Sequence, residues 1–172
     1  QLSRSGGAVE LSNGERKECQ GGAAVIRCFE AVPSASLCYE ETVVWGYLIN
    51  LEKCSFSDRL KMLSTYVPVM DNWAVCDSYC AHAKWMARAD KSELWAFLQP
   101  YFRSTREFEV RFAIVVAMTY FLTEEWLPRI FRKFEALRFE KISSEYQYAK
   151  GKPKVAQQGT AQGPQPYYVR MA

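Results

Sequence analysis

The sequence predicts an all-α protein in which antiparallel helix pairs stack into a curved α-solenoid. Three observations predict this fold class. Apolar residues recur at helical spacing from about residue 37 to residue 141, helix-capping residue types precede most of these periodic segments, and no two neighbouring segments alternate as paired strands would. Because successive helices of similar length are joined by short turns, stacked helix pairs are favoured over a four-helix bundle.

The first three predicted helices lie between residues 40 and 82. One spans about 40–50 and places its apolar side chains on one side, at Val43, Val44, Tyr47 and Leu48. The next is capped by Ser57 and ends before Pro68. The third begins at Asp71 or Asn72, and its apolar stripe comprises Trp73, Cys76, Tyr79 and Cys80.

Three further helices are predicted after residue 90. The first begins at Asp90 or Ser92 and buries Leu94, Trp95, Phe97 and Leu98. The second opens with a capping box, in which Ser104 and Glu107 lie three residues apart, and runs to Leu122. The last opens at residues 123–125, where two glutamates suit the helix dipole, and its inward residues are Leu127, Ile130, Phe131 and Phe134.

The segments outside residues 37–141 differ in composition. Residues 1–36 are rich in Gly, Ser and Ala and are predicted to be weakly structured, apart from residues 23–29, which predict a brief helix or strand. Residues 142–166 have the Pro, Gly and Gln content of a flexible insertion, and residues 167–172 predict the start of a further helix.

Composition excludes several classes of protein. The 172 residues are 49% apolar, which is enough for a buried core and excludes global disorder, and no run of about 18 apolar residues predicts a transmembrane helix. The net charge of +3 is too small to indicate nucleic-acid binding by itself. Because no signal peptide is visible, we expect a cytoplasmic protein whose six cysteines are reduced thiols.

The densest candidate site is the segment Asp71–Asp77. Trp73 and Asp77 are four residues apart on a predicted helix, so an indole and a carboxylate share one face. An aromatic plane beside an anion attracts a cationic group. The alternative is structural: most tryptophans are buried for packing, and Asp77 would then be a solvated or capping carboxylate.

Arginines form the second candidate cluster, at Arg103, Arg106 and Arg111. Arg111 lies within an otherwise apolar helix, where an unpaired guanidinium would be costly. It either faces a groove, where its planar fork would suit a phosphate, or forms an internal ion pair with Asp77 or Glu107. Both alternatives are open at this stage.

The side chains of Cys76, Cys80 and His82 do not predict a zinc site. Cysteines four apart on one helix lack the short spacing of structural zinc ligands, and no second ligand pair lies nearby. We therefore interpret the cysteines as buried apolar side chains and expect neither a metal nor a cofactor. His82 is the single histidine, and no nucleophile motif accompanies it.

Several motifs resemble the AlkD-like DNA alkylation repair family. They span residues 40–138 and resume at residue 167, and they read VWGYL at 44–48, YVP at 66–68, DNWAVCD at 71–77, ELWAFLQPY at 93–101, EFEVRFA at 107–113 and YYVRMA at 167–172. The resemblance implies HEAT-like helical repeats that curve around duplex DNA. It also implies a DNA glycosylase that excises cationic N3- or N7-alkylated purines.

By position, the resemblance assigns catalytic roles to Asp77, Trp73 and Arg111, and we expect Arg103 and Arg106 to contact DNA. In these roles Asp77 stabilises an oxocarbenium-like sugar and orients water, Trp73 lies against the cationic nucleotide, and Arg111 holds a phosphate. The expected partner is alkylated duplex DNA. We expect the protein to bind it as a monomer and not to associate with a membrane. The alternative function is a non-catalytic helical-repeat module that binds DNA or a protein.

Overall fold

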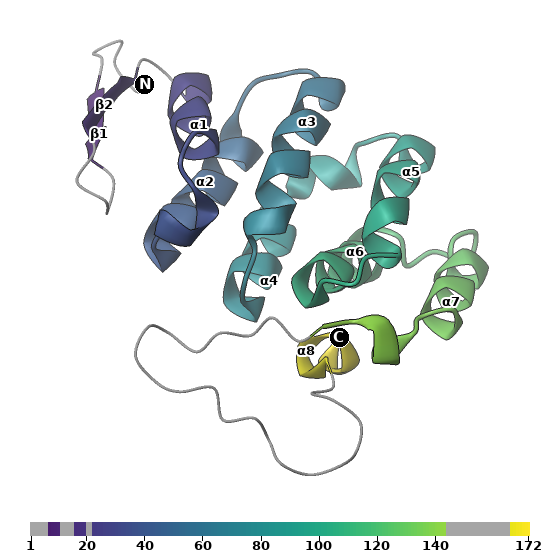
Figure 1. The fold of residues 1–172 in the computed structure, drawn as a ribbon. Helices are drawn as coiled ribbons and strands as arrows, with labels where there is room; N and C mark the ends of the chain where they lie inside the picture. The colour runs from purple at the N-terminus through teal and green to yellow at the C-terminus, as the bar shows by residue number, and fades with distance from the viewer. Residues whose placement is uncertain (1–6, 11–15, 20–21, 144–165) are drawn as a thin grey trace, which may run out of the picture. The chain divides into compact units, whose positions relative to one another are not determined.

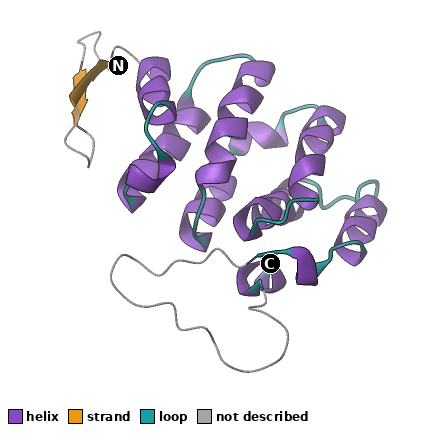
Figure 2. Cartoon of the chain, viewed as in Figure 1, coloured by secondary structure: helices purple, strands orange, loops and turns teal. Residues whose placement is uncertain are grey.

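The computed structural model describes residues 7–10, 16–19, 22–143 and 166–172. Apart from one short hairpin, the regular structure in these ranges is helical, which confirms the predicted all-α class (Figures 1 and 2). The chain divides into two compact units, Gln1–Val69 and Met70–Ala172. None of the helices in the described ranges is long and apolar enough to cross a membrane. The stacking of the helices into a curved solenoid stays a prediction.

The first unit is built on three helices, α1 (Gly22–Glu30), α2 (Tyr39–Leu51) and α3 (Phe56–Tyr66), with 3-10 turns at Ser34–Ser36 and Val67–Val69. Its core is aromatic. Trp45 stacks on Phe29 at a ring distance of 5.9 Å and meets Tyr66 edge-on at 5.2 Å. The Tyr66 hydroxyl donates a hydrogen bond to the carbonyl of Thr42 (3.0 Å), so that α3 is fastened to α2.

The predicted inward face of α2 is wrong. The buried residues are Thr42, Trp45, Gly46 and Ile49, whereas Val44 and Tyr47 are exposed. Aliphatic and aromatic residues occur on nearly every side of this helix, so the spacing of apolar residues did not identify the buried side. The burial of Trp45 and the close approach of Tyr66 over Gly46 determine it instead.

Two expectations for the N-terminal segment are wrong. Residues Gly7–Glu10 (β1) and Arg16–Cys19 (β2) form an antiparallel hairpin, although the sequence predicts no strand pair. Cys28 on α1 is disulfide-bonded, whereas Cys38, Cys54, Cys76 and Cys80 are free thiols. Residues 23–29, left open as helix or strand, lie in α1, which contacts β2. Pairing of cysteines depends on which elements meet in space, and spacing alone does not reveal it.

The junction between α2 and α3 is closed by an arginine. Ser55, not the predicted Ser57, caps α3 by accepting a hydrogen bond from the amide of Asp58 (3.1 Å). The buried side chain of Arg59 donates to the carbonyls of Ile49, Asn50 and Glu52. These are carbonyls that the end of α2 leaves without helical partners, so Arg59 stabilises that end.

The second unit comprises α4 (Trp73–His82), α5 (Lys91–Phe102), α6 (Glu107–Tyr120), α7 (Leu127–Glu135) and α8 (Tyr167–Met171), with 3-10 turns at Lys84–Ala87 and Phe139–Lys141. Helix α6 packs against α4, α5 and α8. Asp77 and Cys80 of α4 bond to Arg111 and Tyr120 of α6, respectively, so the two helices run in the same direction. An aromatic cluster joins α5 to the segment that follows α6. It comprises Trp95, Phe121 and Trp126, whose ring centroids lie 5.0–5.4 Å apart.

Of the four helix starts predicted from residue 71 to residue 125, two are confirmed and two are wrong. Asn72 and Asp90 cap α4 and α5 through their side chains. The capping box at Ser104 does not form: α6 begins at Glu107 after Arg106, because the carboxyl group of Glu107 is buried in the core. Helix α7 begins at Leu127 and not at residues 123–125, which form a turn that buries Trp126. Phe131, predicted to face inward, is exposed.

The predicted insertion at residues 142–166 lies outside the described residues, except for residues 142, 143 and 166. Ile142 and Pro166 are buried. The amide of Ser143 donates to the carbonyl of Thr105 (2.7 Å). The chain on both sides of the segment is therefore packed against the second unit.

Candidate functional site

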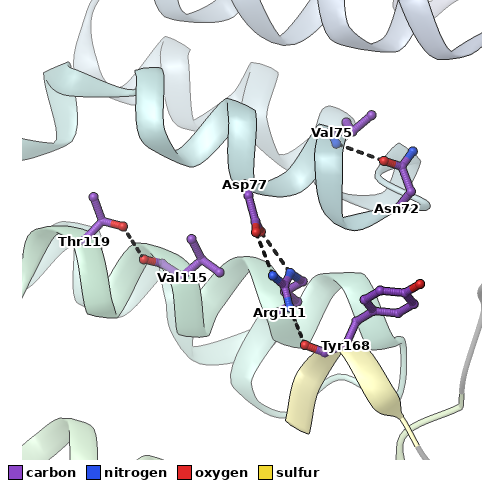
Figure 3. A network of polar contacts seen from close by, with 7 residues as sticks. All are labelled: Asn72, Val75, Asp77, Arg111, Val115, Thr119 and Tyr168. Atoms are coloured by element: carbon purple, nitrogen blue, oxygen red, sulfur yellow. Dashed lines mark hydrogen bonds and ion pairs between the residues drawn. The ribbon is translucent and has the colours of Figure 1, made fainter. Parts of the chain in front are cut away.

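The start of α4 carries the indole and the carboxylate that the sequence singled out. Asn72 caps the helix by accepting a hydrogen bond from the amide of Val75 (3.0 Å), which fixes Trp73 as its first residue (Figure 3). Trp73 is 50% exposed, so the alternative that it is a core residue is wrong. Asp77 lies one turn later with 35% of its side chain exposed. Residues four apart share a helix face, so both groups are open to solvent on the same side of α4.

Asp77 is held in a two-point ion pair by Arg111 of α6. The Nε of Arg111 donates to Oδ1 of Asp77 at 2.9 Å, and Nη2 donates to Oδ2 at 2.6 Å (Figure 3). Only 7% of the Arg111 side chain is exposed. Of the alternatives left open by the sequence, the internal ion pair is therefore formed, and its partner is Asp77 rather than Glu107.

The ion pair also affects the pKa of Arg111. Burial by itself lowers the pKa of Arg111, but the hydrogen bonds and charge of Asp77, with smaller effects of Cys76 and Cys80, raise it above its usual value. A fork of this kind is stronger and more directional than a single hydrogen bond. Arg111 thus fixes the orientation of the Asp77 carboxylate, while about a third of the Asp77 side chain stays accessible to solvent.

A second set of contacts joins Arg111 to α8, and sequence analysis missed it. Nη1 of Arg111 donates to the carbonyl of Tyr168 (Figure 3). The backbone amide of Tyr168 donates to Oε1 of Glu107 at 2.7 Å. Glu107 is fully buried, and it precedes Arg111 by one turn of α6. The sequence contained a signal for this contact, because a buried acid such as Glu107 requires a hydrogen-bond partner. The spacing of Ser104 and Glu107 indicated a capping box instead.

The cysteines and the histidine of α4 do not converge. Cys76 and Cys80 are fully buried, as the sequence predicts, and burial raises the pKa of Cys80 well above its usual value. A thiol in this state is a weak nucleophile. His82 is exposed at the end of the helix, where Nδ1 lies 2.7 Å from the carbonyl of Ser78. Within the described residues, no group of three acidic, cysteine or histidine side chains could hold a metal.

The remaining predicted arginines lie at the turn between α5 and α6. Arg103 is exposed, and Arg106 forms a salt bridge with Glu109 at 2.9 Å. Because α4 and α6 run in the same direction, this turn lies at the end of the helices where Trp73 begins α4. The structure places the two arginines near one end of the α4–α6 pair and not beside the Asp77 carboxylate.

A half-exposed indole and a partly exposed carboxylate therefore lie one turn apart on α4, and these are two kinds of group that attract cations. Comparisons with protein-family models, with curated proteins and with solved structures found no match. The roles that the resemblance implies for Trp73, Asp77 and Arg111 therefore stay predictions.

Proposed function

We propose that this protein is a DNA glycosylase that excises cationic N3- or N7-alkylated purines from duplex DNA. The observation that carries the proposal is the pair of solvent-accessible groups on α4, the half-exposed indole of Trp73 and the carboxylate of Asp77, whose orientation is fixed by Arg111. An alkylated purine carries a positive charge, and this surface combines the two features that attract one.

The proposed roles follow from the exposure of each side chain. Trp73 lies against the cationic nucleotide. Asp77 stabilises the oxocarbenium-like sugar that forms as the base departs, and it orients the attacking water. Arg111 is too deeply buried to meet a phosphate, so in this proposal it orients Asp77. Fixing a charged group before the reaction removes the cost of reorganising it in the transition state.

A second candidate function is a non-catalytic helical-repeat module that binds DNA or a protein. One observation favours it: both oxygens of Asp77 are bonded to Arg111, as in an ion pair that serves only to stabilise the fold. Against this, about a third of the Asp77 side chain is exposed, whereas a purely structural pair gains nothing from that exposure.

The decisive experiment measures release of N3-methyladenine or N7-methylguanine from alkylated duplex DNA. We expect Asp77→Asn to reduce the rate about 100-fold, the usual effect of losing one transition-state contact of this kind. Trp73→Ala should also reduce it, whereas Phe131→Ala, which removes an exposed aromatic ring from α7, should not. Unchanged release by Asp77→Asn would remove Asp77 from the mechanism.

The binding measurement separates the two candidate functions. If the wild-type chain binds duplex DNA but releases no methylpurine, the glycosylase proposal is wrong and the binding module is favoured. Binding to DNA weakens steeply as salt rises, because phosphate contacts release counterions. Binding that does not change with salt would exclude phosphate contacts and favour a protein partner over DNA.

A further inference from the structure

The main chain of Tyr168 bridges two side chains of α6. Its amide donates to Glu107 and its carbonyl accepts from Arg111, and these side chains are one helical turn apart. The ring of Tyr168 packs on Phe108 at 5.6 Å, which holds the peptide against α6. Helix α8 is thus bound to α6 by both polar groups of a single residue.

Glu107 makes this arrangement possible. The first amides of α8 lack helical acceptors, as in every helix, and Pro166, which precedes α8, provides no side-chain cap for them. Glu107 accepts from one of them and is itself fully buried. Its other oxygen, Oε2, has no hydrogen-bond partner among the described residues. A carboxyl group so placed is costly to bury, which indicates that its contact with α8 compensates for part of that cost.

The contacts form one continuous chain from Glu107 through Tyr168 and Arg111 to Asp77. The carbonyl of Tyr168 and the carboxylate of Asp77 bind different nitrogens of Arg111 and so fix the planar guanidinium at two of its edges (Figure 3). With α8 displaced, the guanidinium would be held by Asp77 alone and the pair could turn together. Such a rotation would matter for catalysis, because a misplacement of about 1 Å can cost a catalytic group about 100-fold in rate.

We propose that Glu107 is a positioning residue, which acts through the peptide of Tyr168 and through Arg111 to orient the carboxylate of Asp77. This inference builds on the proposed glycosylase function. Glu107 touches neither DNA nor water from its buried place; it holds α8, α8 holds Arg111, and Arg111 holds Asp77.

The first arm of the test measures amide hydrogen exchange in the full chain and does not require activity. Asp77→Ala should accelerate exchange of the α8 amides about tenfold relative to those of α5, the effect of losing roughly one hydrogen bond. Asp71→Ala, which removes an exposed acid just before α4, should leave the α8 amides unchanged. Equal exchange of α8 in wild type and Asp77→Ala would overturn the coupling.

The second arm measures methylpurine release. Glu107→Leu should lower kcat about tenfold with KM unchanged, because DNA contacts are untouched. Glu107→Gln keeps an acceptor for the Tyr168 amide and should restore kcat to within about threefold of wild type. Combined with Asp77→Asn, Glu107→Leu should cause no further loss, whereas a merely structural role would lower kcat by the same factor in both backgrounds. Glu135→Leu, an exposed position on α7, is the matched control.

The two arms separate failure of this inference from failure of the proposed function. If wild type releases methylpurine and Glu107→Leu has the kcat of wild type, Glu107 does not position Asp77 although the function stands. If Glu107→Leu does not fold, Glu107→Gln decides: a loss of kcat as large as that of Asp77→Asn would overturn the role of the acceptor. If wild type releases nothing, the function fails and the exchange arm alone decides whether α8 is coupled to Asp77.

Discussion

The ion pair between Asp77 and Arg111 gives a stability prediction that does not depend on function. Asp77→Ala removes two charge-assisted hydrogen bonds of 2.9 and 2.6 Å and leaves a guanidinium that is only 7% exposed without its partner. Breaking a buried pair in this way costs about 3–5 kcal/mol. Because 35% of the Asp77 side chain is already exposed, water can enter the gap, and we expect a loss at the lower end, about 3 kcal/mol.

Urea denaturation followed by circular dichroism measures this loss, and it corresponds to a fall in Tm of about 6–12 °C for a chain of this length. Asp71→Ala should cost less than about 0.5 kcal/mol, since Asp71 is exposed and accepts a hydrogen bond from the side chain of its neighbour Asn72. A double-mutant cycle with Arg111→Met should give a coupling of about 2 kcal/mol. Equal stability of Asp77→Ala and Asp71→Ala would refute the ion pair.

Two further predictions concern buried tyrosines. Gly46→Ala should cost about 1–3 kcal/mol in urea denaturation, because a Cβ there would overlap the hydroxyl of buried Tyr66 and lie 2.8 Å from its Cζ. Gly22→Ala, whose Cβ meets the movable carboxylate of Glu52, is the control, and an equal cost would contradict the packing. Burial, with a smaller effect from Glu109, raises the pKa of Tyr101 to about 12, whereas in the unfolded chain it is about 10. The neutral phenol therefore contributes its full stabilisation below a pH of about 10, and this contribution is lost as the pH rises to about 12. Tyr101→Phe should flatten the fall in unfolding free energy over this range; an unchanged slope would show that Tyr101 titrates normally.

Local signals in the sequence predicted the helices well, and the limits of those signals explain the errors. Asn72 and Asp90 cap their helices as expected, because a cap depends on four consecutive residues. Ser104 failed as a cap because Glu107, its intended partner, bonds to Tyr168, which lies 61 residues away. No local pattern contains such a contact. The inward face of α2 was missed for a similar reason, since Tyr66 of another helix determines it.

The candidate site was predicted in its residues but not in its connections. Helical spacing alone placed Trp73 and Asp77 on one face, and the cost of an unpaired arginine left two alternatives for Arg111, an ion pair or a groove. The choice between Asp77 and Glu107 could not be made from the sequence, because Glu107 lies one turn before Arg111 on the same helix, whereas Asp77 lies on another helix that no local pattern places beside Arg111. The structure distinguishes them by burial: Asp77 is open on one side, whereas Glu107 is enclosed and meets α8.

The unequal exposure of Asp77 and Arg111 has an electrostatic consequence. The pair is neutral in sum, yet its positive member is enclosed and its negative member meets solvent, so it is a dipole whose negative end points outward. A cation approaching this face of α4 is attracted, and an anion is repelled, although no net charge resides there. The phosphates of a bound duplex would therefore avoid Asp77 and approach where a positive charge is exposed, as at Arg103. In the proposed complex with DNA, this dipole would favour a positively charged base and would keep the phosphates on either side of it at a distance.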